Sequence, residues 1–198
     1  MPFHSLTFST GFVIINATME KIYYTDKCAF VDTDSAIRYL LSEFYGFNDA
    51  RILRTENGKP ILDGTPFFLS VSHTKDRLFI ALSRDNVGLD AEHIQREVDY
   101  APIVKKFKPA ERGEIRCTEG FLRHWTAKEA AVKWLGGTLA RDLYKLDYIG
   151  GKMQYGELEL PAKFTFLRFG ECLLCVCGER DFEEAELIEF SNKKENVI

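Results

Sequence analysis

The stretch Val87–Gln95, VGLDAEHIQ, places two carboxylates at the end of an apolar run that predicts a β-strand. Residues two apart on a strand point to the same face, so Asp90 and Glu92 stand side by side while Ala91 faces the other way. Such a pair is costly to bury unless a cation or a bound proton compensates its charge. What compensates it decides both the fold around this strand and its chemistry.

Two interpretations of this carboxylate pair are open. A hard divalent cation such as Mg²⁺ suits it, because Mg²⁺ binds one or two carboxylates and completes its shell with water and substrate phosphate. In the alternative, the strand ends here and both acids are solvated at its edge.

The clearest helix of the sequence is predicted over residues 121–135, FLRHWTAKEAAVKWL, before Gly136. Glu129 and Lys133 are four residues apart and share one face of this helix, with Lys128 beside them around the turn. In one interpretation, Glu129 is a third metal carboxylate and Lys133 a phosphate-binding cation. In the other, they form an ordinary surface ion pair worth a few tenths of a kcal/mol.

A third motif, SVSHT, spans residues 70–74 and ends the preceding predicted strand. His73 lies among hydroxyl groups at the end of this strand, where it could hold phosphate oxygens. A Ser–His–Asp triad is a second interpretation, but no Gly-x-Ser-x-Gly elbow flanks the motif. A structural histidine that caps a turn is the third.

The remaining pattern predicts a mixed α+β chain. A helix is expected over residues 34–47, with Asp34 or Ser35 as its cap and Gly46 as its stop. Helical turns broken at Pro109 are expected over residues 99–115. Strands are expected over residues 6–18, 50–54, 60–62, 65–73, 77–92, 146–150, 156–170 and 171–180, and a frayed tail over 191–198.

Strands, helix and strands thus appear twice, which predicts two similar α+β lobes, 1–95 and 96–198. Each lobe is expected to contain an antiparallel sheet and a long helix.

Composition excludes several classes of protein. The 198 residues are 45% hydrophobic and 28% charged, which is ordinary for a globular domain of this length. The net charge of −4 disfavours a nucleic-acid binder. No run approaches the roughly 18 apolar residues of a membrane-spanning helix, and the first residues lack the pattern of a secretory signal. A cytoplasmic protein is expected.

The five cysteines are an odd number, which favours free thiols over a disulfide framework. The segment CLLCVC has the spacing of half a zinc site, but no second Cys or His pair accompanies it. No glycine-rich loop of the Walker or dinucleotide type is present.

Positive charge gathers in the middle of the chain. Between Asp99 and Lys133 there are eight basic and five acidic residues. An acidic partner is expected to dock on the segment from Lys105 to Arg123, with help from the apolar side chains of Ile103, Val104 and Phe107.

Four motifs in this order, NGKPIL, SVSHT, VGLDAE and WTAKEAAVK, resemble the 4′-phosphopantetheinyl transferase superfamily. The segment FKPAE, residues 107–111, resembles the loop between the last two motifs of that family. The resemblance spans Asn57 to Lys133 and is closest to the longer, two-lobed type that activates surfactin synthetase. Such enzymes transfer the 4′-phosphopantetheine group of coenzyme A to a serine of an apo carrier protein and release adenosine 3′,5′-bisphosphate.

The resemblance implies a role for each matching residue. The metal ligands would be Asp90, Glu92 and Glu129, which hold Mg²⁺, or Mn²⁺ as the alternative, against the pyrophosphate of coenzyme A. Glu129 would also be the base towards the serine hydroxyl, directly or through a water.

Lys133 would be the second catalytic residue and, with His73, would hold phosphate oxygens, assisted by Ser72. The adenine and 3′-phosphate end of coenzyme A would lie along Gly58, Lys59 and Pro60.

The implied partner is an acyl, peptidyl or aryl carrier protein, with no nucleic acid and no membrane involved. The resemblance also implies that the active-site cleft lies between the two lobes and that the protein is a monomer, because shorter members of the family form an equivalent cleft by associating subunits. The N-terminal region departs from the family, because its basic residues Lys21, Lys27 and Arg38 do not align with the family pattern. Two other functions remain open: another Mg²⁺-dependent phosphoryl-transfer or phosphodiester-cleaving enzyme, and a non-catalytic adaptor that binds carrier proteins.

Overall fold

The computed structural model describes residues 20–191. The strands predicted over residues 6–18 and all but the first residue of the predicted tail lie outside this range. The described elements, in chain order, are β1 (Lys21–Asp26), α1 (Thr33–Tyr45), β2 (Arg51–Arg54), β3 (Pro60–Asp63), β4 (Phe68–His73), β5 (Arg77–Ser83), β6 (Val87–His93), α2 (Ala101–Val104), α3 (Pro109–Glu114), α4 (Thr118–Leu135), α5 (Leu139–Asp142), the 3₁₀ turn η1 (Leu143–Lys145), β7 (Leu146–Ile149), β8 (Lys152–Tyr155), β9 (Leu158–Glu159), β10 (Lys163–Phe169), β11 (Cys172–Gly178) and β12 (Glu186–Glu189).

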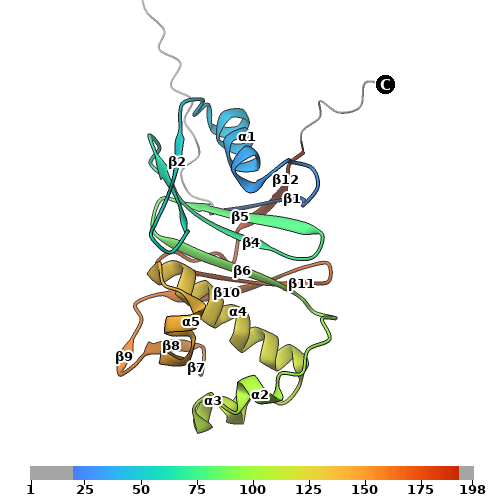
Figure 1. Ribbon diagram of the computed structural model, residues 1–198, viewed down its shortest axis with the longest axis vertical. Coiled ribbons are helices and arrows are strands. Elements are labelled where there is room, and N and C mark those ends of the chain that lie inside the picture. The colour runs from blue at the N-terminus through green and yellow to red at the C-terminus, as the bar shows by residue number, and fades with distance from the viewer. Residues whose placement is uncertain (1–19, 192–198) are drawn as a thin grey trace, which may run out of the picture.

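Two main sheets form the centre of the molecule, with strand orders β12-β1-β5-β4 and β10-β11-β6 (Figure 1). Two smaller sheets, β2-β3 and β7-β8-β9, lie beside them. The mixed α+β class is confirmed. The expectation of purely antiparallel sheets needs a correction, because β1 and β12 pair in parallel, with Lys21 opposite Glu186.

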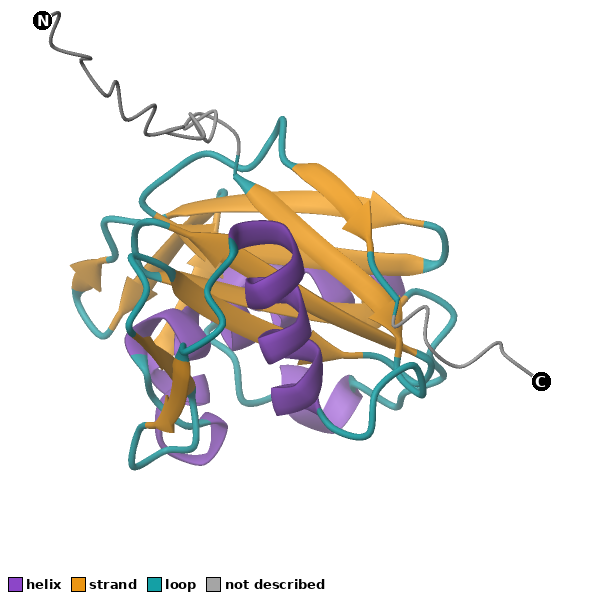
Figure 2. Cartoon of the chain, turned by 90° about the horizontal axis from the view of Figure 1, so that it is seen from above, coloured by secondary structure: helices purple, strands orange, loops and turns teal. Residues whose placement is uncertain are grey.

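Alternation along the strands separates three apolar layers of core. The β5 residues Leu78, Ile80 and Leu82 pack against α1, whereas Phe79 and Ala81 face the second sheet. The same alternation in β6 turns Leu89 and Ala91 towards the first sheet. The result is a stack of helix, sheet, sheet and helix (Figure 1), with α1 covering the sheets on the side that faces the viewer in Figure 2.

The two long helices end where glycine allows it. Gly46 after α1 and Gly136 after α4 adopt left-handed backbone angles, with φ of 73° and 65°. Both glycine stops were predicted. The α1 cap is Asp32 rather than Asp34 or Ser35, because the Asp32 carboxylate accepts from the Ser35 amide in a capping box. Helix α4 begins at Thr118, three residues before the predicted start.

Helix α4 packs directly on β6 because residue 88 has no side chain. A Cβ at Gly88 would lie 2.0 Å from the Ala130 carbonyl oxygen and 2.7 Å from the Trp134 amide nitrogen. The backbone of the strand therefore touches the backbone of the helix at this point. Asp90, two residues further along the same face of β6, consequently faces α4 at close range.

The two main sheets are joined by side chains where β4 and β6 lie side by side. The hydroxyl oxygens of Ser70 and Ser72 accept hydrogen bonds from the amides of Leu89 and Ala91, at 2.8 and 3.1 Å. Both serines are buried. They satisfy β6 amides that a backbone ladder would otherwise satisfy.

A buried ion pair fixes the opposite face of α4. Lys128 is fully buried, and its Nζ lies 2.7 Å from Glu111 Oε2 and over the Phe107 ring at 3.5 Å. Glu111 Oε1 also contacts His124 Nδ1 at 3.2 Å. Burial lowers the pKa of Lys128, while the charge of Glu111 opposes that change. Lys128 therefore belongs to the core and not to the face that carries Glu129.

Each main sheet combines strands from both sides of residue 95. β6 precedes that residue and pairs with β11, whereas β12 follows it and pairs with β1. The sequence missed β1, β8, α5 and β12. A lobe boundary near residue 95 stays a prediction. Between residues 20 and 191, none of the helices has the length and apolar character needed to cross a membrane.

We expect Gly88→Ala to lower the free energy of unfolding by about 2–3 kcal/mol, because the new methyl group overlaps backbone atoms of α4 that cannot move independently. Urea denaturation measures the change. The control is Gly113→Ala in α3, where a Cβ meets no atom within 4 Å, so stability should stay the same or rise slightly. Equal stability of the two variants would contradict the close packing of β6 on α4.

Candidate active site

Three carboxylates meet where the end of β6 faces the middle of α4. Asp90 and Glu92 come from the strand and Glu129 comes from the helix, and one oxygen of each lies within 4.8 Å of the others. The family resemblance implied this convergence, which the strand and helix motifs by themselves had left open. An edge position with solvated acids does not describe Asp90, which is only 3% exposed.

The two oxygens of Asp90 have different surroundings. Oδ1 accepts hydrogen bonds from Ser72 Oγ at 2.9 Å and from Lys133 Nζ at 2.8 Å. Oδ2 is buried and has no hydrogen-bond partner among residues 20–191. A buried carboxylate oxygen without a partner is costly, and a cation beside it would remove that cost. The residues present therefore fit a divalent metal ion.

Glu129 shows the effect of crowding acids in a buried place. Burial and the neighbouring charge of Asp90, with a smaller contribution from Glu92, raise its pKa to about 8, against the opposing charge of Lys133. Glu92 is paired with Arg96, four residues along the chain. Lys133 and Arg96 thus compensate part of the negative charge, and the site remains suited to a further cation.

Lys133 is held by the site and is not a solvated surface charge. Its Nζ donates to the Leu89 carbonyl oxygen at 2.8 Å as well as to Asp90. The alternative of a surface ion pair between Glu129 and Lys133 is therefore wrong, since Lys133 pairs with Asp90 instead.

The NGKP motif and the end of α4 line one cavity of about 230 Å³ next to Lys133. Gly58, Lys59 and Pro60, the three residues predicted to line a ligand site, all contribute to it. The other lining residues are Asn57, Ser70, Val71, Lys133, Gly136 and Gly137. The structure therefore brings Lys59 and Lys133 to the same cavity, from motifs far apart in the sequence.

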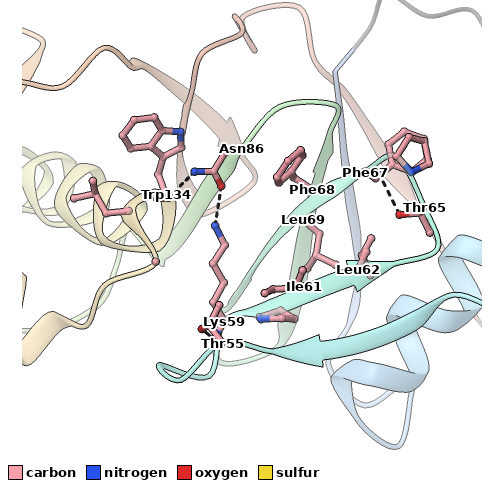
Figure 3. A pocket seen from close by; sticks show the side chains of 14 residues that line it. Thr55, Lys59, Ile61, Leu62, Thr65, Phe67, Phe68, Leu69, Asn86 and Trp134 are labelled. Carbon is pink, nitrogen blue, oxygen red and sulfur yellow. Dashed lines mark hydrogen bonds between the residues drawn. The ribbon is translucent and has the colours of Figure 1, made fainter.

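Asn86 organises this region, and sequence reasoning missed it. Its Oδ1 accepts from Lys59 Nζ at 3.0 Å and its Nδ2 donates to the Trp134 carbonyl oxygen at 2.7 Å (Figure 3). Lys59 also donates to the Val87 carbonyl oxygen at 3.2 Å, and burial lowers its pKa to about 8. A larger apolar pocket of about 550 Å³ shares Lys59 and Pro60 with this cavity.

Ser72 and His73 diverge, although they are neighbours in the SVSHT motif. Ser72 points inward to Asp90, whereas His73 is exposed and its Nε2 lies 3.1 Å from Thr33 Oγ1. Protein atoms around its ring desolvate it in part although the residue is exposed, and this partial desolvation, together with the positive charges of Lys27 and Lys133, lowers the pKa of His73. Lys27, which the sequence could not assign, is thus a cation in the neighbourhood of His73. The Ser–His–Asp triad is wrong, because Ser72 hydrogen-bonds Asp90 and His73 bonds Thr33.

The segment expected to dock an acidic partner is only partly available. Lys105, Lys106 and Arg112 are exposed, but Phe107 is 4% exposed and packs inside the core. The part of the expectation that used Phe107 as a surface contact is therefore wrong. The neighbouring Tyr144 is an exposed aromatic side chain, with Lys106 Nζ 5.2 Å from its ring centre.

The fold and the site define an α+β protein in which three carboxylates that fit a divalent cation lie next to a cavity bordered by two lysines. A sequence model of the 4′-phosphopantetheinyl transferase superfamily matches residues 86–154, the segment that contains β6 and α4. The resemblance to the superfamily is confirmed over this segment. The longer, two-lobed type stays a prediction.

Two curated relatives match part of the chain, each in an alignment that is 92 residues long. The 4′-phosphopantetheinyl transferase AcpT of Salmonella typhi is 35% identical, and the protein of the same name from Salmonella typhimurium is 33% identical. Each alignment covers 42% of this chain and 48% of the relative. The chain thus spans about half the length of the curated relatives it matches.

We expect Mg²⁺ to raise the melting temperature of the wild-type protein and to leave that of Asp90→Asn nearly unchanged, because the variant loses the buried anionic oxygen. At one hundred times the dissociation constant, a bound ion stabilises the folded state by about 2.7 kcal/mol. Differential scanning fluorimetry with and without Mg²⁺ checks this. Glu119→Gln, which removes an exposed acid paired with Arg168, should respond like the wild type. An equal shift in Asp90→Asn would exclude Asp90 as a ligand.

Proposed function

We propose that the protein transfers the 4′-phosphopantetheine group of coenzyme A to a serine of an apo carrier protein. The observation that carries the proposal is the convergence of Asp90, Glu92 and Glu129 beside the cavity that contains Lys59 and Lys133. The match to the superfamily over residues 86–154 and the name of the two Salmonella relatives support it.

In this reaction the serine hydroxyl oxygen attacks the phosphorus that carries the pantetheine arm. A new phosphoester bond forms, the pyrophosphate P–O bond breaks, and adenosine 3′,5′-bisphosphate leaves with the bonding electrons. The hydroxyl proton passes to the Glu129 carboxylate, directly or through a water. Phosphoryl transfer asks a protein mainly for positioning and for charge stabilisation.

The residues of this chain would supply both. Asp90, Glu92 and Glu129 would hold Mg²⁺, with Mn²⁺ as the alternative, and the bound ion supplies positive charge at the pyrophosphate. Lys133 contacts Asp90 and also lines the cavity. When coenzyme A binds, Lys133 would give up one of its present hydrogen bonds and donate to a phosphate oxygen instead. Lys59, Gly58 and Pro60 would contact the adenine and 3′-phosphate end, and His73 would contact a phosphate oxygen.

The wider assignments belong to the same proposal. One long helix on each main sheet supports two α+β lobes, 1–95 and 96–198, in a monomer whose active site lies between them. The partner would be an acyl, peptidyl or aryl carrier protein of the cytoplasm. An acidic carrier would meet the exposed cations Lys105, Lys106 and Arg112.

The decisive assay incubates the protein with coenzyme A, Mg²⁺ and apo carriers of the fatty-acid, polyketide and nonribosomal-peptide classes. Mass spectrometry should show the gain of one phosphopantetheine arm on at least one carrier. We expect Glu129→Gln to lower the turnover at least a hundredfold, since it removes both a metal ligand and the base. Coenzyme A binding should remain measurable in this variant. Wild-type turnover in Glu129→Gln would rule out this catalytic role.

Coenzyme A affinity should fall as the pH rises through about 8, because the Lys59 ammonium then loses the proton that makes it attractive to phosphate. Below that pH the side chain is charged and the affinity is at its plateau. Above it, the affinity decreases by up to about tenfold per pH unit, as for the loss of one proton. Titration calorimetry between pH 7 and 9.5 without divalent ions measures the slope. Lys59→Arg stays charged and should show less of it; parallel profiles for the two proteins would exclude Lys59 from the phosphate site.

Reversing the charges of Lys105, Lys106 and Arg112 to glutamate should raise the carrier Michaelis constant at least tenfold and leave that of coenzyme A unchanged, because electrostatic complementarity acts on the docking protein. Steady-state kinetics with varied carrier concentration checks this. The control reverses the charges of Lys152 in β8 and Lys163 in β10, which form exposed ion pairs away from the proposed docking segment. If the variant with all three charges reversed has the same carrier Michaelis constant as the wild type and the control variant, the docking surface lies elsewhere.

A further inference from the structure

Ser72 differs from its neighbour Ser70 in one bond only. Both hydroxyls are buried between β4 and β6, and each accepts a hydrogen bond from a β6 amide. The Ser72 hydroxyl also donates to Asp90 Oδ1 at 2.9 Å. A hydroxyl has a single proton, so this bond commits the whole donor capacity of Ser72 to the metal-site carboxylate.

That bond fixes which way the Asp90 carboxylate faces. The last torsion of an aspartate side chain has broad energy wells, so the carboxylate turns easily unless its oxygens are held. Ser72 and Lys133 together occupy Oδ1. Oδ2 remains, buried and without a partner in the described chain, as the oxygen available to an ion shared with Glu92 and Glu129.

We propose that Ser72 is a positioning residue of the cation site, which orients Asp90 through Oδ1 and thereby presents Oδ2 to the metal ion. Its importance for transfer rests on the proposed function, but its effect on the ion does not require coenzyme A or a carrier. This differs from the assistance to phosphate binding that the family resemblance implied, because both hydrogen bonds of the Ser72 hydroxyl go to β6. Groups that orient a metal ligand commonly change the affinity for the metal by about 10- to 100-fold.

The test measures Mn²⁺ binding to the protein alone, by electron paramagnetic resonance of the free ion. We expect Ser72→Ala to raise the Mn²⁺ dissociation constant at least about tenfold. Ser70→Ala is the matched control, because it also removes an acceptor for a buried β6 amide and leaves Asp90 untouched; its dissociation constant should stay within about twofold of the wild type. Thermal melts should show a similar loss of stability in both alanine variants.

Ser72→Thr restores the hydroxyl and should bind Mn²⁺ more tightly than Ser72→Ala. If Ser72→Ala does not fold, Ser72→Cys keeps the side-chain volume with a much weaker donor and gives the same comparison. Equal Mn²⁺ affinity in the Ser70 and Ser72 variants, or no Mn²⁺ binding by the wild type, overturns the proposal. Normal Mn²⁺ binding without transfer to any carrier would instead overturn only the proposed function.

Discussion

The direct contact between β6 and α4 at Gly88 is the constraint on which the rest of the molecule depends. A side chain at this position would overlap the Ala130 carbonyl oxygen, so the strand and the helix meet backbone to backbone. Lys133 is thereby brought close enough to hydrogen-bond both Leu89 and Asp90. The same approach brings Glu129 to the two strand carboxylates. With α4 displaced by the width of a side chain, neither set of contacts would form.

The opposite face of α4 explains how this contact is maintained. Lys128, the residue before Glu129, points into the core, and both partners of its ion pair with Glu111 are buried. Removing one partner of such a pair leaves an uncompensated buried charge, which is strongly destabilising. The pair therefore opposes rotation of α4 about its axis. Adjacent residues of one helix thus have different tasks: Lys128 fixes the helix, and Glu129 faces the site.

The parts of the site that lie within one element followed from the sequence because their geometry is local, whereas the meeting of β6 with α4 was implied by the family resemblance. Strand alternation fixes the common face of Asp90 and Glu92, and helix periodicity fixes that of Glu129 and Lys133. The contribution of Asn86 could not be predicted, because it depends on three segments meeting in space. The burial of Lys128 was not predicted for a related reason. On a helix in contact with protein on both sides, periodicity does not tell which polar residue is buried.

The fold was predictable to a similar extent, and its prediction also failed where segments far apart in the sequence meet. Both glycine stops and most strands were correct, since turn residues and apolar runs signal them directly. β12 was missed because its segment is rich in acids and pairs only at a sheet edge, with a partner at the other end of the chain. Such long-range pairing leaves no mark in a short window of sequence.

The parallel pairing of β1 with β12 has a consequence for biosynthesis. The ribosome makes the chain from the N-terminus, so β1, β5 and β4 emerge long before the strand that covers their outer edge. Until Glu186–Glu189 has left the exit tunnel, the edge of β1 stays open to strands of other nascent chains. A strand that is translated much later thus closes the first sheet, and a polypeptide released before that strand is made would carry an unprotected edge even though its carboxylate centre is already encoded.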